Sequence, residues 1–142
     1  MEFFPASDAT QWELIKRVIE EVDYYVVILG GKYGSIGPED LSYTEMEYDY
    51  AIEIGVPVLG FVKTDIEELP HKFVENDQEK IKKLDAFRAK VQSRTCRMFK
   101  DPKELGMAVM KSLMHEARVD REQVGFVRIK ENLTLTENEK RL

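Results

Sequence analysis

The sequence predicts an α/β fold with an open, all-parallel sheet, and three features of residues 26–62 support this prediction. Two apolar runs, at residues 26–29 and 56–62, lack the polar alternation of half-exposed strands and suit strands buried on both faces. A glycine-rich loop and a short helical segment separate them. This order describes a β-loop-α-β unit, so residues 30–41 are expected at the carboxyl ends of the strands, where open parallel sheets bind ligands.

The other segments continue the alternation of strands and helices. Helix starts are marked by capping residues and by Asp101-Pro102, and Gly55 marks a helix end. The predicted elements are a strand at 1–5, a helix starting within 7–10, a strand at 22–29, a helix at 43–54, a strand at 56–62, a helix at 77–92, a strand at 95–99 and a helix opening at 101–102.

The chain is expected to form one α/β domain over residues 1–118, with a tail or linker over residues 119–142. A length of 142 residues suits a single hydrophobic core. Within the tail, residues 125–129 (GFVRI) have strand character. This segment either begins a linker or pairs with an open sheet edge, and the sequence leaves both alternatives open.

Composition and spacing exclude several functional classes. The net charge is −6 and the basic residues are interspersed with acids, so no nucleic-acid partner is expected. The apolar runs have strand length, which argues against a membrane partner. Cys96 is the single cysteine and the two histidines are isolated, so neither a metal site nor a cofactor is predicted, and the expected compartment is the cytoplasm.

The helix predicted at residues 43–54 carries an acid on its apolar side. Both Ser42 with Glu45 and Thr44 with Glu47 match a capping box. Glu47 is therefore either a cap near the positive end of the helix dipole, or a half-buried nucleophile, base or ribose ligand facing the crevice. At 100° per residue, the expected core side holds Tyr43, Met46, Tyr50, Ala51 and Ile54, and the expected solvated side holds Glu45, Asp49 and Glu53, with Tyr48 also at the surface.

The loop and the start of this helix supply the other candidate ligand-binding residues. Backbone amides of a glycine-rich loop can hold a phosphate, although no phosphate-loop spacing occurs here and glycines also serve tight turns. Tyrosine rings beside a crevice can stack on a base, and serine hydroxyls can bind a ribose, but Ser42 is equally explained as a helix cap. The candidates are Gly30, Gly31, Tyr33, Gly34, Ser35, Ser42 and Tyr43.

The segments MEFFPASDATQWELIKRVIEEVDYYVVILGGKYGSI and LSYTEMEYDYA closely resemble an uncharacterised bacterial domain-of-unknown-function family. The resemblance covers roughly residues 1–116 and implies a TIR-like, flavodoxin-like three-layer sandwich, found at the N-terminus of larger proteins with NTPase or repeat modules. More distantly, EYDYAIEIGVPVLGFVKTD is similar to nucleoside 2-deoxyribosyltransferases, whose nucleophilic glutamate falls on Glu47. TIR-domain NAD hydrolases also carry a catalytic glutamate, in an S-x-x-x-x-E pattern that Ser42 to Glu47 fits.

Two departures from these families affect the functional expectation. Gly30 and Gly31 stand where deoxyribosyltransferases carry an aspartate, near the end of the strand before the loop. Family members also have a further strand and helix before the segment that begins here at Met1, so the chain is expected to start inside the domain. The gap left in the sheet is expected to be filled by residues 125–129, from the same chain or a second copy, or else to cause dimerisation through the exposed edge.

Three functional hypotheses remain at this point. The first is a TIR-like signalling or defence module that binds or cleaves a nucleotide such as NAD at its N-glycosidic bond through Glu47. The second is a non-catalytic domain for self-association or protein interaction. The third is a nucleotide-sensing module without turnover. The fold class is compatible with all three, so the site has to distinguish them.

Overall fold

The computed structural model describes the backbone of residues 10–124 and the side chains through residue 119. The chain divides into two compact units, Met1–Leu105 and Gly106–Leu142. The strands predicted at residues 1–5 and 125–129 lie outside the described residues. The division into a domain over 1–118 and a tail over 119–142 stays a prediction.

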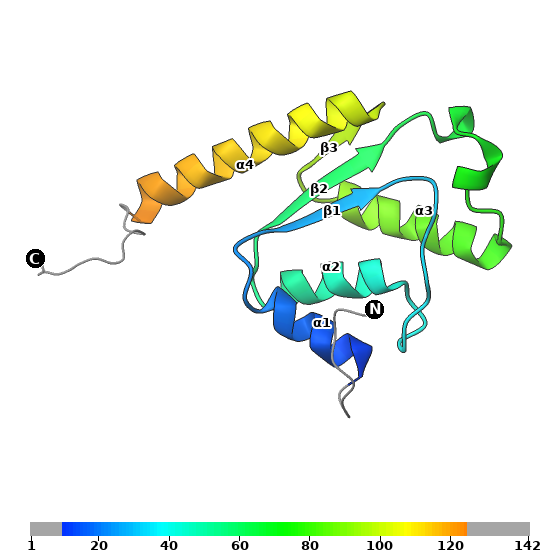
Figure 1. Cartoon of the computed structure of the whole chain (residues 1–142), viewed down its shortest axis with the longest axis horizontal. Coiled ribbons are helices and arrows are strands. Elements are labelled where there is room, and N and C mark those ends of the chain that lie inside the picture. Colours follow the sequence, from blue (N-terminus) through cyan, green and yellow to red (C-terminus); the bar gives the residue numbers. More distant parts are fainter. Residues whose placement is uncertain (1–9, 125–142) are drawn as a thin grey trace, which may run out of the picture. The chain divides into compact units, whose positions relative to one another are not determined.

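Helices and strands alternate throughout the described residues, as the sequence predicts (Figure 1). Two short 3₁₀ helices interrupt the polar loop around Pro70. In chain order, the elements are α1 (Gln11–Ile19), β1 (Tyr25–Leu29), α2 (Tyr43–Glu53), β2 (Val58–Lys63), η1 (Ile66–Glu68), η2 (His71–Phe73), α3 (Gln78–Gln92), β3 (Cys96–Phe99) and α4 (Pro102–Val124).

The described strands form one open sheet in the order β1-β2-β3. Both neighbouring pairs are parallel, and the register aligns Val27 with Gly60 and Gly60 with Cys96. Each pair of strands is connected through a helix, as parallel pairing requires. The predicted α/β fold with an open parallel sheet is therefore confirmed.

Local capping signals fix the helix starts. The Thr10 side chain accepts a hydrogen bond from the Glu13 amide and the Glu13 side chain caps Thr10 in return, while Ser42 and Asp77 cap α2 and α3. The predicted start of the first described strand, at residue 22, is wrong. The amide of Val22 still bonds to the carbonyl of the last residue of α1, so the chain becomes extended only at Tyr25.

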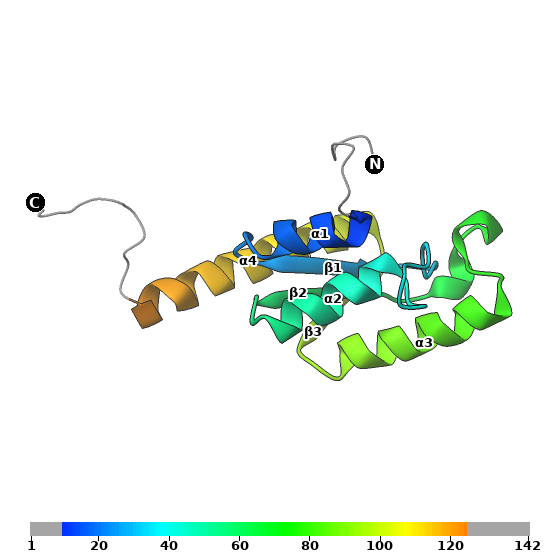
Figure 2. The same cartoon turned by 90° about the horizontal axis from the view of Figure 1, so that it is seen from below.

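The main core lies between one face of the sheet and the helices α2 and α3, which Figure 2 shows beside the strands. Burial of these apolar side chains is the main stabilising term of this unit. The side chains on the other face of the sheet are buried unevenly: Phe61 is 1% exposed, whereas Ile28 is 47% exposed. The buried core residues are Val27, Leu29, Tyr33, Tyr48, Val62, Leu84, Phe87 and Val91.

Candidate functional site

The loop between β1 and α2, residues 30–42, is tied to both neighbouring helices. The amide of Tyr43 donates to the carbonyl of Ser35 at 3.0 Å, which holds the second half of the loop against the start of α2. Lys83 of α3 donates to the carbonyl of Asp40 at 2.5 Å and pairs with its carboxylate at 3.1 Å. These contacts give the loop a defined conformation.

The first half of the loop packs tightly against the segment that follows η2. The carbonyl of Gly31 accepts a hydrogen bond from the amide of Glu75 at 2.7 Å, and the amide of Tyr33 donates to the Glu75 carboxylate at 3.0 Å. A Cβ atom at Gly31 would lie 2.3 Å from the carbonyl oxygen of Phe73. The close approach of the Phe73 backbone thus explains why residue 31 is a glycine. The Tyr33 amide, one of the loop amides that could have bound a phosphate, is already bonded to a carboxylate.

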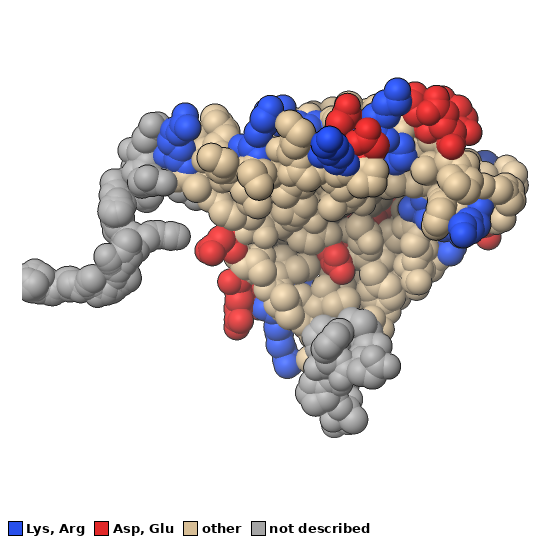
Figure 3. All heavy atoms as spheres, turned by 45° about the horizontal axis from the view of Figure 1, so that its top comes forward, with Lys and Arg blue, Asp and Glu red and all other residues tan. Residues whose placement is uncertain are grey.

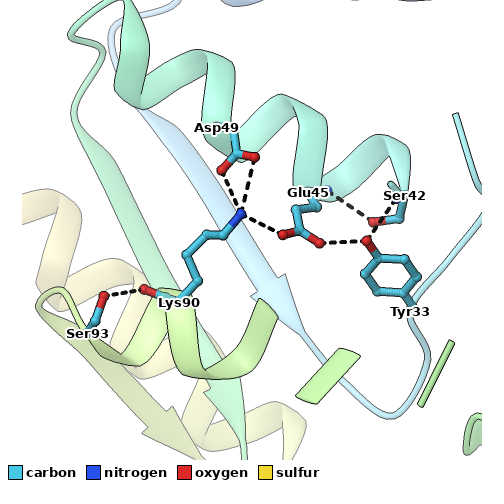
Figure 4. A network of polar contacts seen from close by, with 6 residues as sticks. All are labelled: Tyr33, Ser42, Glu45, Asp49, Lys90 and Ser93. Carbon is cyan, nitrogen blue, oxygen red and sulfur yellow. Dashed lines mark hydrogen bonds and ion pairs between the residues drawn. The ribbon is translucent and has the colours of Figure 1, made fainter. Parts of the chain in front are cut away.

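Tyr33, Ser42 and Glu45 form a closed set of hydrogen bonds at the start of α2 (Figure 4). The Tyr33 hydroxyl donates to Glu45 Oε1 at 2.5 Å and accepts from the Ser42 amide at 3.0 Å. The Ser42 hydroxyl accepts from the Glu45 amide at 3.1 Å as the helix cap. Ser42 is fully buried and Tyr33 nearly so, so these groups satisfy one another away from water.

Lys90 of α3 neutralises the acids of this cluster from the neighbouring helix (Figure 4). Its Nζ atom lies 2.5 Å from Glu45 Oε2 and 3.0 Å from Asp49 Oδ1. Burial lowers the pKa of Lys90, but the hydrogen bonds to the two carboxylates outweigh burial, so the pKa lies above the usual value for lysine. We call Tyr33, Ser42, Glu45, Asp49 and Lys90 the loop network.

Three predictions about the faces of α2 are wrong. Glu45 was expected at the surface but is 4% exposed, and Tyr48 was expected there too but is 1% exposed. Tyr50, expected in the core, instead packs edge-on against Trp12 of α1 and donates to Glu20. The physical reason is that α2 contacts α1, the sheet and α3 on different sides, so a single apolar stripe does not describe its burial.

Glu47 is half-buried and has its partner on β1 rather than in the loop. The Tyr25 hydroxyl donates to Glu47 Oε1 at 2.8 Å. Burial, together with the adjacent Glu47 carboxylate, holds the pKa of Tyr25 far above its usual value, so Tyr25 remains a proton donor. In the part of the chain that the structure describes, no hydrogen bond reaches Glu47 Oε2.

The predicted site residues therefore fall into groups that bond to different partners. The loop network joins Tyr33 and Ser42, backbone contacts join Ser35 and Tyr43, and Glu47 pairs with Tyr25. Gly34 has a φ of 101°, which explains its identity, whereas nothing lies near the Cβ position of Gly30. That Tyr33, Ser35, Tyr43 and Glu47 line one concavity at the carboxyl ends of the strands stays a prediction.

The sequence did not predict which residues bond to the candidate acids or to the loop. Lys90 lies 45 residues from Glu45, and no spacing rule links a helix residue to an acid so distant in sequence. Glu75 and Tyr25 likewise reach their partners across long separations. The one local signal was the pair of acids at Glu45 and Asp49, four residues apart, because like charges on adjacent turns destabilise a helix unless a cation lies between them.

The tyrosines of this region make stability sensitive to alkaline pH. Burial is the first cause that raises the pKa of Tyr25, Tyr33 and Tyr48 above the usual value of about 10. The unfolded chain then loses these phenol protons at lower pH than the folded chain, so the free energy of unfolding should fall as the pH rises above about 10. Urea unfolding at increasing pH measures the fall, and Tyr25→Phe should make it shallower. An equally steep fall in that variant would contradict this assignment.

The described residues contain no group of three or more metal-ligating side chains that could hold an ion, and no described helix is long and apolar enough to cross a membrane. Basic and acidic side chains are interleaved on the face shown in Figure 3.

Comparison with known proteins identifies the family. A family model described as "Domain of unknown function (DUF4062)" matches residues 1–114. No match was found among curated proteins or among solved structures. Because the matched region spans most of the 142 residues, from the segment before α1 into α4, the chain belongs to the DUF4062 family.

Proposed function

We propose that this chain is a TIR-like signalling or defence module that binds a nucleotide such as NAD and cleaves its N-glycosidic bond through Glu47. The observation that supports the proposal is the contact between Glu47 and Tyr25. The Tyr25 hydroxyl, 2.8 Å from Glu47 Oε1, orients a half-buried carboxylate whose second oxygen has no hydrogen-bond partner among the described residues. A carboxylate held in this way can act as a nucleophile.

Glu45 is a poor candidate for the same role. Both of its carboxylate oxygens are engaged, one by the Tyr33 hydroxyl and one by Lys90. Its exposure of 4% also leaves no room for a substrate atom to approach without breaking the loop network. Of the two glutamates in the first turns of α2, Glu47 is therefore the one available for chemistry.

The proposed reaction uses the Glu47 carboxylate as a nucleophile. Glu47 Oε2 attacks C1′ of the ribose, and the bond from C1′ to the nicotinamide nitrogen breaks with its electron pair going to nicotinamide, which leaves neutral. Water then hydrolyses the glycosyl ester, which yields ADP-ribose, releases one proton and regenerates the carboxylate. Tyr25 holds Oε1 throughout and keeps its own proton because its pKa is raised.

Release of nicotinamide from NAD, followed by chromatography, tests this proposal. Glu47→Gln should lower the rate by at least about a hundredfold, a loss of roughly 3 kcal/mol of transition-state stabilisation, because the amide cannot act as the nucleophile. The matched control is Glu53→Gln on the exposed side of the same helix, which should retain the rate. No release by the unmodified chain, or equal losses in both variants, would refute the enzymatic proposal.

A non-catalytic module is the alternative, and the state of the loop favours it. The amide of Tyr33 is bonded to Glu75, and the hydroxyls of Tyr33 and Ser42 are bonded within the loop network, so these groups are not free for a ligand. Such a rigid surface suits protein interaction or nucleotide sensing. Calorimetric titration distinguishes these two non-catalytic functions. Heat of NAD binding without nicotinamide release indicates a sensor, and no heat indicates protein interaction.

A further inference from the structure

The segment between β2 and α3 contains the two 3₁₀ helices and lies beyond the carboxyl end of β2 (Figure 1). We call residues 65–76 the β2–α3 segment. No residue of η1 or η2 is buried, and neither of these short helices has a side-chain cap. Segments with few buried apolar contacts open at a lower cost in free energy than the core of a domain. The β2–α3 segment is therefore expected to open more readily than the sheet beneath it.

A small set of contacts holds this segment against the loop after β1. The amide of Glu75 donates to the carbonyl of Gly31 at 2.7 Å, and the Glu75 carboxylate accepts from the Tyr33 amide at 3.0 Å. A Cβ atom at Gly31 would lie 3.1 Å from Leu69 Cδ1 and 2.3 Å from the carbonyl oxygen of Phe73. The segment and the loop thus meet at Gly31, one of the candidate ligand-binding residues.

The Glu75 carboxylate occupies a position that suits an anionic ligand group. The loop follows β1 at the carboxyl edge of a parallel sheet, where ligands bind and where backbone amides can hold phosphates. Lys32 in the same loop is exposed and forms no ion pair with another described residue. A Glu75 oxygen on the Tyr33 amide therefore makes the bond that a phosphate oxygen would make.

We propose that the β2–α3 segment is a lid and that Glu75 forms an autoinhibitory contact, which an anionic ligand group such as a phosphate displaces from the Tyr33 amide. The described structure is the closed state, in which the lid covers Gly31. Asp65, with a φ of 55°, and Asp77, the cap of α3, mark the ends of the moving part. The proposal goes beyond the reaction assigned to Glu47, because it concerns access of a ligand to the loop.

Calorimetric titration with inorganic pyrophosphate tests the displacement. Glu75→Gln should bind pyrophosphate about tenfold more tightly than the unmodified chain, because a neutral amide forms a weaker bond for the ligand to break. The matched control is Glu67→Gln, which removes the same charge from an exposed residue of η1 and should leave the affinity unchanged. Equal gains in both variants, no gain in Glu75→Gln, or no binding by any of the three chains would overturn the proposal.

Gly31→Ala tests the lid without a ligand. The φ angle of Gly31 is not positive, so its backbone accepts alanine, but the new Cβ atom would clash with the Phe73 carbonyl and push the segment away. Trypsin should then cleave after Lys72, in η2, several-fold faster than in the unmodified chain. Mass spectrometry of the fragments measures the rate at this site.

Gly30→Ala is the matched control for the cleavage experiment, because nothing lies within 4 Å of its Cβ position. Its cleavage after Lys72 should match that of the unmodified chain. If circular dichroism shows that Gly31→Ala does not fold, Glu75→Gln provides the same readout, since it weakens the other contact of the lid. Equal cleavage in the control and in the folded lid variant would show that these contacts do not hold the segment, and would overturn the proposal.

Discussion

Replacing Phe87 by alanine is expected to lower the free energy of unfolding by about 3–5 kcal/mol. Phe87 is fully buried at the centre of the core, and its ring meets those of Tyr33 and Tyr48 edge-to-face, with centroids 6.4 Å and 5.5 Å apart. Removing the ring leaves a cavity and also removes the support on which Tyr33 holds the loop network. Urea denaturation followed by circular dichroism measures the loss.

Phe73→Ala is the matched control, because its side chain is 51% exposed on the loop after β2. Its cost should stay below about 1 kcal/mol, as for most surface substitutions. If Phe87→Ala proves unfolded, Phe87→Leu should still fold with a smaller loss, since it fills part of the cavity. Equal losses for Phe73→Ala and Phe87→Ala would contradict the placement of the core.

Lys90→Met is expected to cost about 2–3 kcal/mol, because it leaves the buried Glu45 carboxylate without its counter-charge. The side chain of Glu45 is 6% exposed, and only the Tyr33 hydroxyl and the hydration that can reach it would then compensate its charge. The side chain of Lys90 is 39% exposed, so the expected cost lies below that of a fully buried pair. The free energy of unfolding in urea reports it.

A double-mutant cycle separates the lost ion pair from lost packing. Glu45→Gln combined with Lys90→Met should recover part of the stability, since the neutral amide carries no unpaired charge. Lys83→Met on the same helix is the control: Lys83 pairs with Asp40, whose side chain is 87% exposed, so the cost should not exceed about 1 kcal/mol. Equal costs at Lys83 and Lys90 would show that the loop network is not buried as described.

The loop network narrows the choice of residues that could carry out an enzymatic reaction in this fold. A buried, mutually satisfied cluster accounts for Tyr33, Ser42 and Glu45, and this leaves Glu47 as the acid that can be tested for chemistry.

Local sequence signals determined the order and most of the limits of the elements. Side chains at Thr10, Ser42 and Asp77 cap their own helices within three residues, so the starts of α1, α2 and α3 could be predicted with little error. The apolar runs likewise predicted a parallel sheet, because burial on both faces needs no polar alternation. The start of β1 was misplaced since the turn after α1 uses backbone bonds that leave no mark in the side-chain pattern.

Tertiary structure alone decided which face of α2 is buried and which acid is free. Helical periodicity places charged residues outward, because an isolated carboxylate in the core is costly. That cost is offset for Glu45 because Lys90 approaches from α3 and Tyr33 from the loop, and neither residue is close to Glu45 in the sequence. Glu47 remains available because its partner is a single neutral hydroxyl, that of Tyr25, which the sheet brings beneath the helix. The sequence alone therefore determined the elements and the sheet, whereas the packing of α3 and β1 against α2 determined which acid of the candidate site is buried in an ion pair and which is only half-buried.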